Sequence, residues 1–239
     1  MKRTHWTQFN TIWFWTAAVI LTLTMSTYSR MSAAKPLGIT VDLSVTGFIT
    51  HDESVYRATG TDAWSAIGPT MGVTVWEGLS VEGGYLYANA EGDAGYTPTK
   101  LNGHGGLVHV RYRIPLESWL DVYARATGAL LWAEMEINPG THRLQDSGIT
   151  GGAGGTLGLE FHFPRDFFWG DEPDSTMSGF TFGGFLEAGY LWMADLKFDS
   201  LTVIPGGDGA GTNQVLEVGN LGSLNLSGTA LRAGLVVHF

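Results

Sequence analysis

Nine charged side chains lie in segments that alternate apolar and polar residues, and all nine fall on the face opposite the apolar one. They are Asp42, Glu82, Arg111, Arg113, Asp121, Arg125, Glu160, Glu187 and Arg232. His109 and His162 share that face. Enclosed acids and arginines must pair, because an isolated buried charge is strongly unfavourable. We therefore predict an internal ion-pair network, which either plugs a lumen or gates a narrow conducting path.

The spacing of nucleophiles and ligands gives little support for catalysis. None of the seven histidines begins a His-x-Ser pair, in which the histidine would activate the serine on the same strand face. No histidine pair has zinc-site spacing, and there is no cysteine. The glycine run at 151–155 lacks the Lys-Ser/Thr ending of a phosphate loop. We expect no catalytic residue, no metal and no cofactor, and hence no enzyme.

Eight segments position these residues, and each alternates with a period of two. They span 40–50, 66–76, 79–89, 104–114, 119–133, 152–163, 179–193 and 229–239. Their apolar faces carry no charge, which lipid demands of an outer wall. A soluble barrel of the lipocalin kind would show the inverse pattern. The fold class expected is therefore all-β: an eight-stranded antiparallel up-and-down transmembrane barrel.

The connections alternate in length, as expected for a barrel with short periplasmic turns and long outer loops. The short ones are 77–78 and 115–118, and the long ones are 51–65, 90–103, 134–151 and 194–228. The segment 164–178 is long for the periplasmic side. The long loops contain twelve acids and four bases: Asp52, Glu53, Asp62, Glu91, Asp93, Glu134, Glu136, Asp146, Asp195, Asp199, Asp208 and Glu217 against Arg57, Lys100, Arg143 and Lys197. Such a rim would suit a divalent cation or a basic surface partner, or would only keep the loops solvated.

The first 34 residues have the layout of a cleaved signal peptide. Lys2 and Arg3 precede an apolar run at 11–25, which is shorter than the roughly 20 residues that span a bilayer. The small residues at 32–34 offer a cleavage site after Ala34. We expect residues 1–34 to be the signal peptide and 35–239 a single barrel domain. The formal net charge of −10 argues against nucleic acid as a partner.

The final segment carries a resemblance. It reads LRAGLVVHF, with Leu231, Leu235, Val237 and Phe239 on one face, and it is similar to the closing strand of small bacterial outer-membrane barrels. The whole segment from 35 to 239 resembles that class, which includes the OmpA membrane domain, OmpX and OmpW. The resemblance implies location in the outer membrane, contact with its lipid and a monomeric barrel. It also implies recognition of the closing strand by the barrel assembly machinery.

Two roles remain open. The first is a non-enzymatic structural or surface-interaction protein with a charged, plugged lumen. The second is a small passive channel, or an OmpW-like transporter that releases apolar solutes sideways into the lipid. Lateral release would depend on Pro69, which lies inside a predicted strand although proline cannot donate to a strand ladder. Pro69 therefore marks either a bulge near the rim or a lateral gap in the wall.

Overall fold

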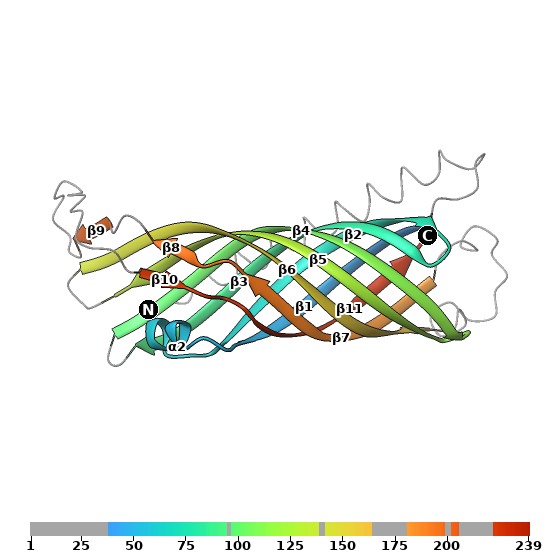
Figure 1. Cartoon of the computed structure of the whole chain (residues 1–239), viewed down its shortest axis with the longest axis horizontal. Helices are drawn as coiled ribbons and strands as arrows, with labels where there is room; N and C mark the ends of the chain where they lie inside the picture. Colours follow the sequence, from blue (N-terminus) through green and yellow to red (C-terminus); the bar gives the residue numbers. More distant parts are fainter. Residues whose placement is uncertain (1–37, 95–96, 139–141, 164–180, 199–201, 206–221) are drawn as a thin grey trace, which may run out of the picture.

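The computed structural model describes residues 38–94, 97–138, 142–163, 181–198, 202–205 and 222–239, and its main body is one closed barrel (Figure 1). Eight antiparallel strands form the ring, each paired with the next and the last with the first. They are β1 (Ile39–Thr50), β2 (Ala63–Trp76), β3 (Leu79–Ala94), β4 (Thr97–Glu117), β5 (Leu120–Ile137), β6 (His142–His162), β7 (Thr181–Met193) and β11 (Gly228–His238). The predicted eight-stranded antiparallel barrel is confirmed.

The two ends of the barrel differ. At one end, the short-turn end, residues 77–78 and 118–119 make tight turns, and β11 finishes beside the start of β1. Gly78 adopts a positive φ of 74° there, which the turn requires. At the other end, the loop end, β3 to β6 run on well past their neighbours (Figure 1). The predicted signal peptide and the segment 164–178 lie outside the described residues.

The strands β3 to β6 are longer than the sequence predicted. Residues 90–94 and 97–103, and likewise 134–137 and 142–151, were expected to be loops but continue the two hairpins. The expected loop at 51–65 contains a short helix, α2 (Glu53–Thr59), and the start of β2. Asp52 caps α2 by accepting a 2.6 Å hydrogen bond from the Ser54 amide. No helix among the described residues is long and apolar enough to cross a bilayer.

Near the short-turn end the outer face is apolar and the inner face polar. Val45, Val110 and Leu157 point outward and are 55%, 44% and 68% exposed. No charged side chain points outward from the described strand positions of this band. In a membrane barrel such an uncharged band faces the hydrocarbon, because a charged side chain at the bilayer midplane costs about 2–4 kcal/mol.

Near the loop end the polarity of the two faces is reversed: the inner face is apolar and the outer face is polar. Ala90, Leu101, Leu131, Ala133 and Met135 point inward and are buried. The outward positions of the same strands hold polar pairs instead, and these are Lys100–Glu91 at 2.6 Å, Arg143–Glu136 at 2.6 Å, Asn89–Asn102 at 2.8 Å and Gln145–Glu134. An exterior of this kind fits water, so the extended hairpins rise beyond the apolar band.

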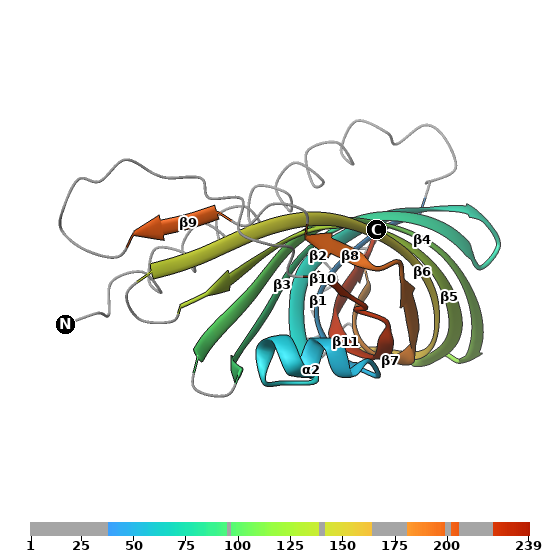
Figure 2. The same cartoon turned by 60° about the vertical axis from the view of Figure 1, so that its left-hand side comes forward.

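A hydrophobic cluster fills the barrel at the loop end. Phe48 stacks on Trp64 with ring centroids 3.9 Å apart, and Val55 of α2 inserts into the same cluster with 1% exposure. The short strands β8 (Leu196–Phe198) and β10 (Gly222–Leu224) pair with each other and bury Leu196 and Phe198 completely. Figure 2 shows α2, β8 and β10 gathered at this end of the barrel. A further strand, β9 (Thr202–Pro205), pairs with the outer part of β6.

Candidate functional site: the charged lumen

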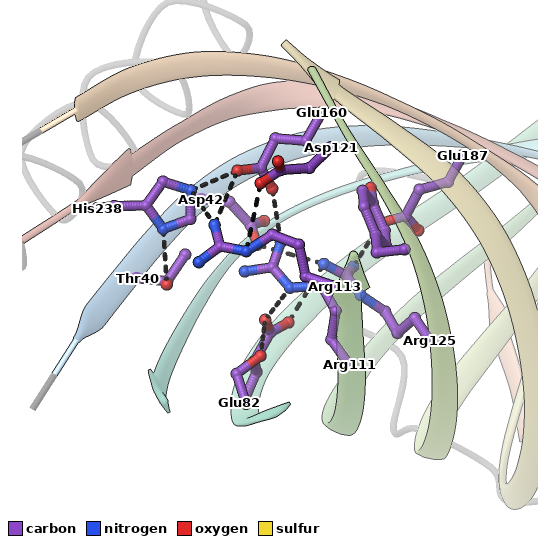
Figure 3. Close-up of polar contacts among 12 residues, drawn as sticks. Thr40, Asp42, Glu82, Arg111, Arg113, Asp121, Arg125, Glu160, Glu187 and His238 are labelled. Carbon is purple, nitrogen blue, oxygen red and sulfur yellow. Dashed lines mark hydrogen bonds and ion pairs between the residues drawn. The ribbon is translucent and has the colours of Figure 1, made fainter. Parts of the chain in front are cut away.

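All nine charged residues singled out in the sequence point into the lumen near the short-turn end, where ion pairs join them. Figure 3 labels all of them except Arg232. They come from seven of the eight ring strands, and β2 adds the hydroxyl of Thr70. Strand alternation explains the gathering, since each charged residue has the inward parity of its own strand.

Arg125 and Arg232 lie at the centre of this network. Arg125 contacts Glu187 at 2.9 Å, Glu82 at 3.2 Å and Asp42 at 3.8 Å. Arg232 contacts Asp42 at 2.6 Å and Glu187 at 3.3 Å. The side chain of Arg125 and its three acidic partners are each 1% exposed, so these charges stabilise one another without water.

Arg111 forms a second centre beside the first. Its Nε lies 2.7 Å from Glu82 and its Nη1 lies 3.0 Å from Glu160, with side-chain exposures of 2%, 1% and 0%. Tyr123 packs against this guanidinium, whose carbon is 5.4 Å from the ring centroid, and donates a 2.6 Å hydrogen bond to Glu187. Gly158 makes room for the ring, because a Cβ at Gly158 would lie 2.4 Å from Tyr123 Cζ.

The mouth of the barrel at the short-turn end holds a looser group. Arg113 lies 3.4 Å from both Asp121 and Glu160, and its side chain is 27% exposed. His162 Nε2 is 2.8 Å from Asp121, and His238 Nε2 contacts Glu160 directly. Figure 3 shows the Arg113 guanidinium between His238 and the carboxylates of Glu160 and Asp121. His238 points into the lumen because it lies on the same face of β11 as Arg232.

A cavity of about 60 Å³ separates the charged network from the hydrophobic cluster. Arg125, Arg232 and Glu187 line its charged side, and Phe48 and Leu191 line its apolar side. The volume has room for a few water molecules. His109, which is 4% exposed, also lines it; His109 Nδ1 lies 2.8 Å from Thr127, and Nε2 has no hydrogen-bond partner among the described residues. Water in this cavity would satisfy that nitrogen.

One arrangement has the connectivity of a catalytic triad without its setting. Thr40 Oγ1 is 3.0 Å from His238 Nδ1, and His238 Nε2 contacts Glu160. A nucleophile must also meet its substrate, but the Thr40 side chain is buried, with 3% exposure, and does not line the cavity. Thr40 therefore serves to orient His238.

The wall beside Pro69 has an interrupted ladder. Pro69 pairs with Leu43 of β1, but the β2–β3 register passes from the Ile67–Tyr87 pair to the Thr70–Gly84 pair. Gly68 nevertheless lies against β3 so closely that a Cβ would be 1.8 Å from the Tyr85 carbonyl oxygen. The backbones are in contact here, although the regular pairing is lost.

Sequence reasoning missed the uncharged members of the lumen. Tyr123 and Phe185 are buried to 1% and 3% exposure among the arginines, and Phe185 lies 4.9 Å below the Arg232 guanidinium. Their signal was the same inward parity as Arg125 and Glu187. The prediction of the lumen considered charged residues and histidines only, so it did not include them.

The sequence matches no protein-family model, and it matches no curated protein. Solved structures similar to this barrel are those of Neisserial surface protein A, with 15% identity and a TM-score of 0.44, and Ail of Yersinia pestis, with 9% identity and a TM-score of 0.40. They cover 85% and 86% of this chain, and 97% and 100% of their own. A major outer membrane protein of Thermus thermophilus is similar at 12% identity and a TM-score of 0.41, over 84% of this chain and 99% of its own.

The architecture of the chain itself decides the fold. Eight antiparallel strands close into a ring, the described outer wall is apolar and uncharged over its central band, and the interior beneath that band is polar. This is a small outer-membrane β-barrel.

Proposed function

We propose that this outer-membrane barrel is a non-conducting structural protein that carries an interaction surface at its loop end. The observation that carries the proposal is the double closure of the lumen. Buried ion pairs such as Arg125–Glu187 close one level, and the hydrophobic cluster around Phe48 and Trp64 closes another. An eight-stranded barrel is just wide enough for its own side chains to fill it.

The loop end supports the surface role. Extended hairpins, the helix α2 and the β8–β10 pair form a platform beyond the apolar band, and most of its described outward side chains are polar, with Pro98 and Tyr56 as exceptions. Polar, ordered structure held above a membrane suits contact with another macromolecule or with ions. The acidic residues of this end favour a basic or cationic partner.

Planar-bilayer recording of the refolded protein tests the closure. We expect no steady conductance from the natural sequence. The positive control is the double variant Phe48→Ala with Arg232→Ala, which removes one member from each closed level and should conduct. Steady unitary openings of the natural sequence would contradict the proposal.

A second candidate function is lateral release of an apolar solute through the wall at Pro69. The interrupted β2–β3 ladder favours it, because Gly68 and Leu86 on either side of the interruption also line the cavity. Pro69→Val would supply an N–H to the wall and reduce flux of an apolar dye in liposomes. The plugged barrel predicts unchanged flux, and circular dichroism verifies the fold in both cases.

A further inference from the structure

The mouth at the short-turn end brings together two imidazoles and two carboxylates that are scattered in the sequence. Glu160, His162 and His238 each place one ligand atom within 4.8 Å of the other two. Asp121 adds a fourth, since its Oδ2 lies 2.8 Å from His162 Nε2. We propose that these four residues bind a divalent transition metal, with Zn²⁺ as the best fit.

The donor set suits zinc in type and number. Zinc is held by four ligands in a tetrahedron, and imidazole nitrogens with carboxylate oxygens are common among them. Bonds of about 2.0–2.2 Å place neighbouring ligand atoms roughly 3.3–3.6 Å apart. The distances of 2.8 Å and 3.8 Å from His162 Nε2 to Asp121 and Glu160 bracket that spacing, so small side-chain rotations would complete the site.

The surroundings orient the ligands. Thr40 Oγ1 lies 3.0 Å from His238 Nδ1; in the tautomer whose Nδ1 donates to this oxygen, the lone pair lies on Nε2, and a metal ion would stand between Nε2 and Glu160. On β7, Gly183 pairs with His162 of β6 and with Val236 of β11, so no β7 side chain lies beside His162 at this level, while His238 pairs with Thr181. The histidine side chains are 14% and 16% exposed, so an ion can enter from the short-turn end.

The charges of the network leave room for a cation here. Five carboxylates meet four arginines in the lumen, and the mouth is where an arginine is held least tightly. Arg113 contacts Asp121, Glu160 and His238 Nε2 at 3.4, 3.4 and 3.3 Å, all longer than a good charge-assisted hydrogen bond. Arg113 therefore occupies the cation position loosely, and it competes with the metal for the His238 lone pair.

The competition makes the proposal testable in both directions. The barrel refolded in detergent micelles is titrated with Co²⁺, whose visible absorption reports tetrahedral coordination, and Zn²⁺ then displaces it. We expect one bound ion per chain. The double variant His162→Ala, His238→Ala should lose the absorption, while the matched control His51→Ala, His104→Ala should keep it, since His51 and His104 lie outside the mouth.

Two further variants keep all four ligands. Arg113→Gln should tighten Zn²⁺ binding by about tenfold or more, because the competing guanidinium is gone. Thr40→Val should weaken binding about 10- to 100-fold, the usual effect of losing a residue that orients a ligating histidine.

Zn²⁺ should also raise the unfolding temperature of the natural protein, and it should raise that of the histidine double variant less.

Several outcomes would overturn the metal site. These are no Co²⁺ absorption in the natural protein, equal absorption in both double variants, or weaker binding in Arg113→Gln. If the double variant at the mouth does not fold, the Arg113→Gln result alone decides, since that variant retains every proposed ligand.

Discussion

The two ends of this barrel distribute apolar and charged side chains in opposite ways, although the same strands run through both. Near the short-turn end the apolar residues face outward and the charges face inward, whereas near the loop end Leu131 and Met135 face inward and Glu134 and Glu136 face outward. The strands continue from one region to the other without a break between Thr127 and Ile137 in their pairing. The difference therefore reflects the medium outside the wall, and not a change of fold.

The hydrophobic cluster and the ion-pair network fill the lumen at different heights, and the medium outside the wall explains which interaction is used at each height. Where water surrounds the wall, burying apolar side chains is favourable, so a hydrophobic cluster closes the lumen. Where hydrocarbon surrounds the wall, apolar burial gives no such advantage, and ion pairs such as Arg111–Glu160 hold the interior together.

Removing a central charge should have the largest effect. Arg125→Ala leaves Glu82 and Glu187 short of a partner in a buried site, so we expect a loss of about 3–5 kcal/mol in urea unfolding from micelles. Arg57→Ala is the control, because its pair with Glu53 is 77% and 81% exposed and should matter by about 0.5 kcal/mol or less. Equal losses in the two variants would remove the distinction between buried and exposed pairs.

Placing a charge on the outer wall tests where the lipid band lies. Val108→Arg should destabilise the barrel by about 2–4 kcal/mol, because Val108 points outward from β4 within the apolar band. Ser147→Arg places the same residue on the outer face of β6 near the loop end and should change stability by less than about 0.5 kcal/mol. If Ser147→Arg proved as costly as Val108→Arg, the band would extend further than proposed.

Two adjacent leucines of β5 lie on opposite faces of the strand, so their substitution compares the two faces. Leu131 is 3% exposed in the hydrophobic cluster, whereas Leu130 is 62% exposed on the outer wall. Leu131→Ala should cost about 2–3 kcal/mol, since it leaves a cavity in the cluster. Leu130→Ala should cost less because lipid or detergent fills the space. The ranking is checked by unfolding in the same micelles, and its reversal would contradict the assignment of faces.

The smallest effect is expected at α2. Asp52→Ala removes the cap and should destabilise the helix by about 1 kcal/mol, measurable as faster hydrogen exchange over residues 54–59. Hydrogen bonds with the Ser54 side chain and amide hold the pKa of Asp52 below its ordinary value of 3.8. The cap is therefore fully effective above that pH and is lost as the pH falls below it. Asp52→Asn should abolish this pH dependence while retaining most of the protection.

The barrel could be predicted because its membrane part has one simple rule. The alternation of Val41, Leu43 and Val45 with Asp42 and Ser44 assigns both faces of β1 at once. The loop end does not follow the same rule, because that rule places apolar residues outside and charges inside. Beyond Trp132 the apolar side chains change to the inner face, so a continuing strand was interpreted as an acidic loop.

The charged residues of the lumen were predictable from parity, but their partners were not. Five acids and four arginines on one face allow many pairings, and only the tilt and stagger of the closed ring determine which ones form. The approach of His238 to Glu160 depends on β11 and β6 both pairing with β7, which lies between them in the ring. Such proximity has no trace in the spacing of residues along the chain.

The pairing of β1 with β11 has a kinetic consequence. Asp42 and Arg232 are 190 positions apart in the sequence, yet they share a 2.6 Å ion pair across this seam. Closing so long a loop carries a large entropic penalty, and contacts between distant segments slow folding. The hairpins β2–β3 and β4–β5 can form from neighbouring segments, whereas the seam forms only when the first strand, β1, meets the last strand, β11. The Asp42–Arg232 pair is thus expected to form late in folding, when the pairing of β1 with β11 closes the ring.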